Sequence, residues 1–224
     1  MRKGKYICIE GPDYSGKTTA MNMLANKLKN YQIPVITTKH PGSTPVGQKF
    51  RDLIKNPAVK MDPYTRSIVL AADNHEFQAT IAKPLASSDS WLLADRSNFV
   101  SSLAYQIADG IGLENLRLCH DVIPNPRKID VLFVFMIDYE NRIERKKARE
   151  KIEGESIEYY ERDREHFMKL LTTYSRLMDY KNDLCKFVEH DDDYIPNVKF
   201  IDTSGDSPEN VVDQMFECLN VPMI

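Results

Sequence analysis

The sequence has few cysteines, and their spacing excludes small proteins that are stabilised by a zinc site or by a disulfide framework. Only four of the 224 residues are cysteines, and they lie far apart without CxxC spacing. We therefore expect reduced thiols in a cytoplasmic compartment, and neither a zinc site nor a disulfide framework. These cysteines are Cys8, Cys119, Cys185 and Cys218.

Long apolar runs and a strong net charge are also missing. No stretch approaches the length that spans a membrane, and the basic N-terminus lacks the apolar core of a signal peptide. The formal net charge of -3 at pH 7 gives no global field for nucleic acid. We expect no membrane and no nucleic-acid partner, and a local basic cleft for any small polyanion.

Apolar runs alternate with helical patterns along the chain. This alternation predicts a three-layer α/β domain, with a central parallel five-stranded sheet flanked by helices. At 224 residues we expect a single domain, residues 1–224, with a short lid at about 142–161. Strands are predicted at 6–10, 34–38, 91–94, 130–136 and 198–202.

The predicted helices have apolar residues at spacings of three and four. Ser207 is the expected N-cap of the last helix. The acidic run 190–193 has no further ligand cluster beside it, so we interpret it as a solvated loop rather than a metal site. The helices are predicted at 20–28, 46–54, 63–85, 101–106, 142–149, 157–182 and 208–219.

One short segment meets the template of a phosphate-binding loop: a Gly, four residues, then Gly-Lys-Thr. It lies between the first predicted strand and the first predicted helix, where backbone N–H groups and the helix dipole favour phosphate. Lys17 is expected to reach the β- and γ-phosphates, and the Thr18 hydroxyl to hold Mg²⁺. The predicted ATP site consists of Gly11, Pro12, Asp13, Tyr14, Ser15, Gly16, Lys17, Thr18 and Thr19.

Further polar residues follow the second and third predicted strands. Asp95 and Arg96 end the third strand, and the segment 39–45 leaves the second. Because ligands of open α/β sheets bind beyond the carboxyl ends of the strands, we expect both to lie near Lys17.

The order of these motifs resembles the thymidylate kinase family of nucleoside monophosphate kinases. The resemblance covers most of the chain and implies a P-loop NTPase fold and transfer of the γ-phosphoryl group of ATP to dTMP, with Mg²⁺ as cofactor. The motifs that carry it are GPDYSGKTT (11–19), HPGSTPVGQKFRDLI (40–54), LAADNH (70–75), ADRS (94–97), SSLAYQ (101–106) and IDTS (201–204).

The resemblance implies roles for individual residues. Asp13 would accept a hydrogen bond from the deoxyribose 3′-hydroxyl, Asp95 would lie near Mg²⁺ with Thr18, and Arg51 and Arg96 would bind the acceptor phosphate, which suits the planar guanidinium. Ser102 and Tyr105 would face the base and sugar, with the alignment of this segment to the family motif fixed to within one residue. The implied acceptor site consists of Asp13, His40, Pro41, Arg51, Leu70, Asn74, Arg96, Ser102 and Tyr105.

The lid is expected to supply the remaining positive charge. Some members of the family have an arginine inside the phosphate loop and others have it in the lid; here the loop position is Tyr14. We therefore expect lid cations among Arg145, Lys146, Lys147 and Arg149. The predicted catalytic set is Lys17, Arg96, Asp13, Arg145 and Arg149.

The chain departs from the family at the acceptor base. Leu70 replaces an aromatic residue that stacks on thymine, and Asn74 replaces an arginine that binds the base. The alternative to a dTMP kinase is therefore a related deoxynucleoside monophosphate kinase with another or broader acceptor, such as dUMP. A nucleotide-binding protein without turnover would be expected to lack Lys17, Arg96 or the lid cations. Thymidylate kinases are commonly homodimers, which we also expect here, with Ile68 and its neighbours as candidate contacts.

Overall fold

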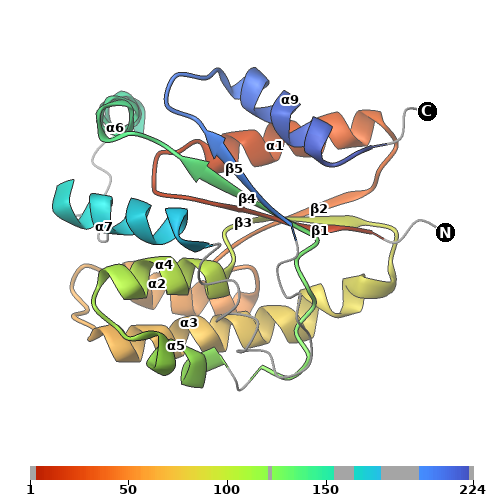
Figure 1. Cartoon of the computed structure of the whole chain (residues 1–224). Helices are drawn as coiled ribbons and strands as arrows, with labels where there is room; N and C mark the ends of the chain where they lie inside the picture. Colours follow the sequence, from red (N-terminus) through yellow and green to blue (C-terminus); the bar gives the residue numbers. More distant parts are fainter. Residues whose placement is uncertain (1–3, 121–122, 154–163, 178–196, 222–224) are drawn as a thin grey trace.

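A parallel sheet between two layers of helices forms the centre of the protein (Figure 1). The computed structural model describes residues 4–120, 123–153, 164–177 and 197–221. The five strands have the order β2-β3-β1-β4-β5 and confirm the predicted fold class, with bounds within one residue of those predicted. They are β1 (Tyr6–Glu10), β2 (Val35–Lys39), β3 (Trp91–Asp95), β4 (Val131–Met136) and β5 (Val198–Asp202).

Strand β1 lies at the centre of the sheet, and its pairing places the ends of three strands together. Ile9 of β1 is opposite Asp95 of β3, and Lys39 of β2 is opposite the same residue. Because all pairings are parallel, the segments that leave β1, β2 and β3 start from one edge of the sheet. This edge carries the predicted site.

The alternation of side chains along the strands divides the core into two halves. Ile7 and Ile9 of β1 pack beneath α1 (Lys17–Asn30) and α9 (Pro208–Cys218), which lie on one face of the sheet (Figure 1). The predicted cap is confirmed, since the Ser207 hydroxyl accepts a hydrogen bond from the Asn210 backbone N–H at 3.2 Å.

The opposite face of the sheet is covered by a larger group of helices (Figure 1). Tyr6 and Cys8 of β1 point to this side, where α4 packs against both α3 and α7. Sequence patterns did not predict α5, which has only eight residues. The helices of this layer are α2 (Pro45–Lys55), α3 (Pro63–Phe77), α4 (Asn98–Ala108), α5 (Leu113–His120) and α7 (Arg164–Ser175).

The region predicted as helical at 63–85 is helical nearly throughout, but only its first part is an α-helix. Helix α3 ends at Phe77, and the chain continues through a π turn, Gln78–Ala82, and a 3-10 turn, Pro84–Ser87. Pro84 has no N–H group to donate, so a regular α-helix would lose a hydrogen bond at this position. The carbonyl oxygen of the Gln78 side chain also accepts a hydrogen bond from the Arg127 backbone N–H at 2.9 Å.

Other predictions fall partly outside the described ranges. The predicted helix 142–149 belongs to the longer α6 (Tyr139–Glu153), and α7 is the described part of the helix predicted at 157–182. Residues 157–163 and 178–182 of that helix, lid residues 154–161, Cys185 and the acidic run 190–193 lie outside the described residues. Among the described helices, none combines the length and apolarity needed to cross a membrane.

Candidate active site

The phosphate loop joins β1 to α1 and needs glycine at two positions. Gly11 and Gly16 have φ angles of 139° and 90°, in the region that disfavours other residues. A Cβ atom at Gly11 would also lie 2.4 Å from the backbone oxygen of Phe135. No side chain caps the start of α1 in the described structure, so its first N–H groups remain available to an anion.

Lys17 is the first residue of α1, and its side chain folds back over the loop. Its ammonium group donates hydrogen bonds to the Pro12 carbonyl at 2.5 Å and to the Ser15 hydroxyl at 3.4 Å. The side chain is largely buried, with 6% of the residue exposed. The loop therefore holds the ammonium group through its own carbonyl and hydroxyl oxygens.

Arg96 brings three of the other predicted site residues together. Its backbone leaves β3 with a φ of 73°, and its side chain crosses the end of β1. The guanidinium donates to the Gly11 carbonyl at 3.0 Å and the Tyr105 hydroxyl at 3.0 Å, and it also contacts the Asp13 carboxylate. The loop, the strand end and α4 thus meet at one side chain.

The charges in this contact alter two pKa values. Burial raises the pKa of Asp13, but the positive charges of Arg96 and Lys17 outweigh that effect and lower it to about 2. Burial likewise opposes the charge of Arg96, but Tyr105 and Asp13 outweigh it and raise the Arg96 pKa well above its ordinary value. Both groups are therefore charged at neutral pH.

Thr18 and Asp95 fit the coordination of Mg²⁺. The Thr18 hydroxyl donates a hydrogen bond to the Asp95 carboxylate, so two oxygen donors lie side by side next to the phosphate loop. In the part of the chain that the structure describes, no three metal-binding side chains form a cluster. Mg²⁺ in kinases commonly takes only one or two protein oxygens, together with phosphates and waters, so the pair is sufficient.

A second basic group lies on α2. Arg51 donates a hydrogen bond to the Pro41 carbonyl at 2.8 Å, which joins two predicted acceptor residues. Lys55, which the sequence analysis missed, is one helical turn further along the same face. Partial burial lowers the pKa of Lys55, and the charge of Arg51 lowers it further. Its spacing of four residues from Arg51, which places both on one helix face, is the sequence signal that would have identified Lys55.

Helices α3 and α4 contain the residues expected at the acceptor base. Leu70 and Asn74 are one turn apart on α3, and both are buried. Ser102 and Gln106 are one turn apart on α4, fully buried, and their side-chain polar atoms have no hydrogen-bond partner in the described structure. Gln106 was missed as a site residue, although it ends the SSLAYQ motif.

His40 is turned toward α3. Its ring lies edge-on to Phe77 with ring centres 4.1 Å apart, and its Nδ1 atom is 3.7 Å from the Asp73 carboxylate. Only 3% of His40 is exposed. The structure therefore packs His40 beneath the loop that contains Pro41, and its role toward an acceptor stays a prediction.

Helix α6 brings cations to the phosphate loop. The Arg145 guanidinium donates to the Thr203 carbonyl, and a Cβ atom at Gly16 would lie 3.6 Å from it. Arg149 is 6.0 Å from the centre of the Tyr14 ring. Lys146 forms an ion pair with Glu150 at 3.7 Å within the same helix. Among the predicted lid cations, the structure thus places Arg145 and Arg149 beside the loop.

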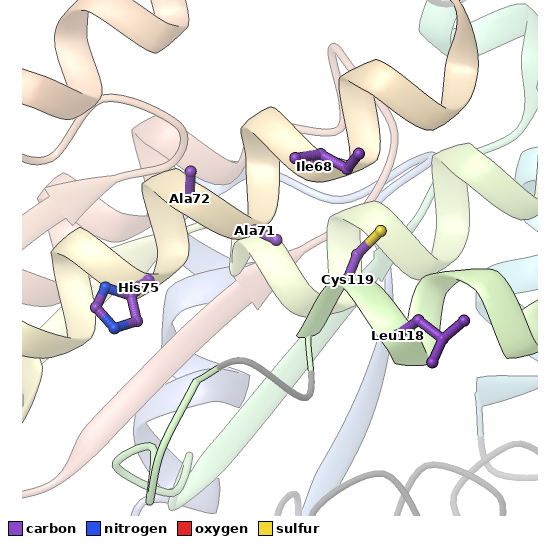
Figure 2. A pocket seen from close by; sticks show the side chains of 6 residues that line it. All are labelled: Ile68, Ala71, Ala72, His75, Leu118 and Cys119. Atoms are coloured by element: carbon purple, nitrogen blue, oxygen red, sulfur yellow. The ribbon is translucent and has the colours of Figure 1, made fainter.

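A hollow of about 520 Å³ lies elsewhere, between α3 and α5. Figure 2 shows its lining side chains, four from α3 and two from α5. The lining is almost entirely apolar and includes none of the predicted site residues. The residues are Ile68, Ala71, Ala72, His75, Leu118 and Cys119.

Comparisons with known proteins identify one family. A family model described as thymidylate kinase matches residues 9–185. The thymidylate kinase of Caldicellulosiruptor saccharolyticus is 33% identical over 162 residues, which cover 70% of this chain and 78% of the relative. The thymidylate kinase of Pelotomaculum thermopropionicum is 33% identical over 174 residues, which cover 75% and 80%.

Proposed function

Since the chain belongs to the thymidylate kinase family, we propose that it transfers the γ-phosphoryl group of ATP to dTMP and forms dTDP. The contact between Arg96 and Asp13 carries this proposal. It joins an arginine outside the phosphate loop to the loop itself, so two anion-binding elements lie side by side. Such an arrangement suits a reaction between two phosphorylated nucleotides.

The donor side is assigned to the loop and to α6. Backbone N–H groups of the loop would bind the ATP phosphates, and Lys17 would turn from the Pro12 carbonyl to the β- and γ-oxygens. Arg145 and Arg149 would neutralise charge on the transferring group, which is the main catalytic requirement in this chemistry. Thr18 and Asp95 would hold Mg²⁺, which would supply further positive charge for the transfer.

The acceptor phosphate is assigned to the basic residues of α2 and to Arg96, which follows β3. Asp13 interacts electrostatically with three cations: Arg51, Lys55 and Arg96. These positive charges therefore lie in one region. Asp13 would accept the 3′-hydroxyl of the sugar, and Tyr105, already bonded to Arg96, would limit space at the 2′ position.

The base is assigned to the facing surfaces of α3 and α4. The unpaired polar atoms of Ser102 and Gln106 are the donors and acceptors that a base edge would satisfy. Leu70 and Asn74 give less stacking area and shorter reach than the aromatic and arginine they replace. This observation favours a second candidate, a kinase of the same mechanism that accepts dUMP or a broader set of acceptors.

The test is an ADP-release assay with ATP, Mg²⁺ and a panel of acceptors. The panel contains dTMP, dUMP, dCMP, dGMP, dAMP and thymidine. The proposal predicts the highest kcat/KM for dTMP and negligible turnover of thymidine, which has no phosphate for Arg96. Preference for another monophosphate would keep the mechanism and change the substrate, and no turnover with any acceptor would overturn the proposal.

We also propose a homodimer with α3 at its interface. Ile68 of α3 and Leu118 of α5 are 59% and 68% exposed, beside the apolar hollow of Figure 2. Exposed apolar groups of this kind mark association surfaces. Light scattering should give twice the chain mass, and Ile68→Glu should give the monomer. A monomeric wild-type protein would contradict the assignment.

A cytoplasmic location is proposed from the thiols. Cys8, Cys119 and Cys218 are free in the described structure, and burial raises the pKa of Cys8, which keeps its thiol protonated. Free thiols persist in reducing compartments. Cell fractionation tests this location, and recovery of the protein from an oxidising compartment would contradict it.

A further inference from the structure

Tyr174 of α7 is buried directly behind Arg96, although it belongs to none of the motifs that define the site. None of its surface is exposed. Its hydroxyl donates to the Glu10 carboxylate at 3.0 Å and accepts from Nη1 of Arg96 at 3.4 Å. A single hydroxyl group therefore bridges the last residue of β1 and the arginine that follows β3.

Glu10 is a buried carboxylate that the proposed mechanism does not use. It accepts hydrogen bonds from the Ser97 backbone N–H at 2.6 Å and from the Ser101 hydroxyl at 2.9 Å. Its second oxygen is 3.8 Å from Nη1 of Arg96, too long for a direct hydrogen bond. Burial raises the pKa of Glu10, and the charge of Arg96 opposes that rise. The Tyr174 hydroxyl lies between the two groups and hydrogen-bonds to both.

The two terminal nitrogens of Arg96 have different partners. Nη1 contacts the Gly11 carbonyl of the phosphate loop and the Tyr174 hydroxyl. Nη2 contacts Asp13 and Tyr105, which are predicted acceptor-site residues. Tyr174 therefore contacts the nitrogen that is not the one beside the predicted acceptor residues.

We infer that Tyr174 is a positioning residue for Arg96. Its hydroxyl links Nη1 of Arg96 to Glu10, and this link directs Nη2 toward the acceptor phosphate. This role rests on the proposed function, because it assigns Arg96 to that phosphate. The left-handed backbone of Arg96, with φ of 73°, is an unfavourable conformation that surrounding contacts must maintain, and Tyr174 provides one of them.

The test compares Tyr174→Phe with Thr173→Val. Both variants delete one hydroxyl from α7. In the described part of the chain, the Thr173 hydroxyl bonds within the helix, to the Lys169 carbonyl at 3.0 Å. Tyr174→Phe should raise the KM for dTMP about tenfold, the effect of one hydrogen bond to a charged group, with the KM for ATP within about twofold of wild type. Thr173→Val should leave both KM values unchanged.

A double variant tests the path through Arg96. In the Arg96→Lys background the Nη1 atom is gone, so adding Tyr174→Phe should change the KM for dTMP by less than about twofold. If Tyr174→Phe is too unstable for rate measurements, the rise of its Tm with dTMP, compared with the rise with ATP, measures the same difference.

The outcomes separate the two assignments. A wild-type protein that does not phosphorylate dTMP overturns the proposed function. An active wild type with an unchanged KM for dTMP in Tyr174→Phe overturns only the role of Tyr174. Equal rises in the KM values for dTMP and ATP, or an additive double variant, also overturn it, since both would indicate a general loss of structure.

Discussion

The residues assigned to the phosphates, here called the phosphate half of the proposed site, and those assigned to the base, called the base half, differ in how their polar groups are paired. In the phosphate half, Lys17 bonds to the loop carbonyl of Pro12, and Arg96 bonds to several acceptors. In the base half, Ser102 and Gln106 are buried with side-chain atoms that have no partner in the described chain. A buried unpaired amide costs stability, which a bound base edge would recover. Under the proposed function, the protein itself pairs the polar groups of the phosphate half, and a bound base would complete those of the base half.

The largest effect is expected from the phosphate half. Lys17→Ala should lower kcat about 10³-fold, because the transferring phosphoryl group loses a charge aimed at it. The fold should persist, since the loop glycines and β1 are unchanged. Steady-state kinetics and circular dichroism measure both properties.

Lys27→Ala is the matched control for this change. Lys27 is on the same helix but pairs with Asp213 at 2.5 Å, away from the loop. Its kcat should stay within twofold of wild type. A near-normal kcat in Lys17→Ala would contradict the proposed mechanism.

A change at Gln106 should separate stability from activity. Gln106→Leu removes an unpaired buried amide, so it should stabilise the protein by about 1 kcal/mol, yet raise the KM for the acceptor about tenfold. Thermal unfolding and acceptor kinetics would show these opposite effects.

Gln78 provides the control, because it is equally buried but bonded to the Arg127 backbone N–H. Gln78→Leu should lower the Tm, since that N–H group loses its partner. If Gln106→Leu also lowers the Tm, the difference drawn between paired and unpaired groups is wrong.

A moderate effect is expected at Lys55. Lys55→Ala should raise the KM for dTMP about fivefold and leave the KM for ATP unchanged, since one of several cations near the acceptor phosphate is lost. Lys49→Ala, an exposed lysine on the same helix, is the control and should change neither value. Equal effects from the two variants would mean that only overall charge matters.

The smallest effect is expected at Asn74. Asn74→Arg should raise the preference for dTMP over dCMP a few-fold, because a guanidinium offers more donors to the base carbonyl than an amide does. The ratio of kcat/KM values for the two acceptors measures it. An unchanged ratio would place the base pocket away from Asn74.

Much of this protein was predictable from local sequence patterns. The strand bounds, the phosphate loop and the position of Asp95 and Arg96 followed from apolar runs and motif spacing. These features depend on neighbouring residues, so they are visible in the sequence. The change of helix type after Phe77 was missed because the helical pattern continues through the following residues and does not distinguish an α-helix from a π or 3-10 turn.

The sequence alone determined the fold class, the family and the residues that can carry charge to a phosphate. Only the tertiary structure decided how these residues are held. The contact of Tyr174 with Glu10 spans 164 positions of the chain, and no local pattern relates them. Nor could the sequence separate Gln106, buried without a partner, from Gln78, buried with one. Hydrogen-bond pairing in the interior depends on which distant groups the packed helices bring together.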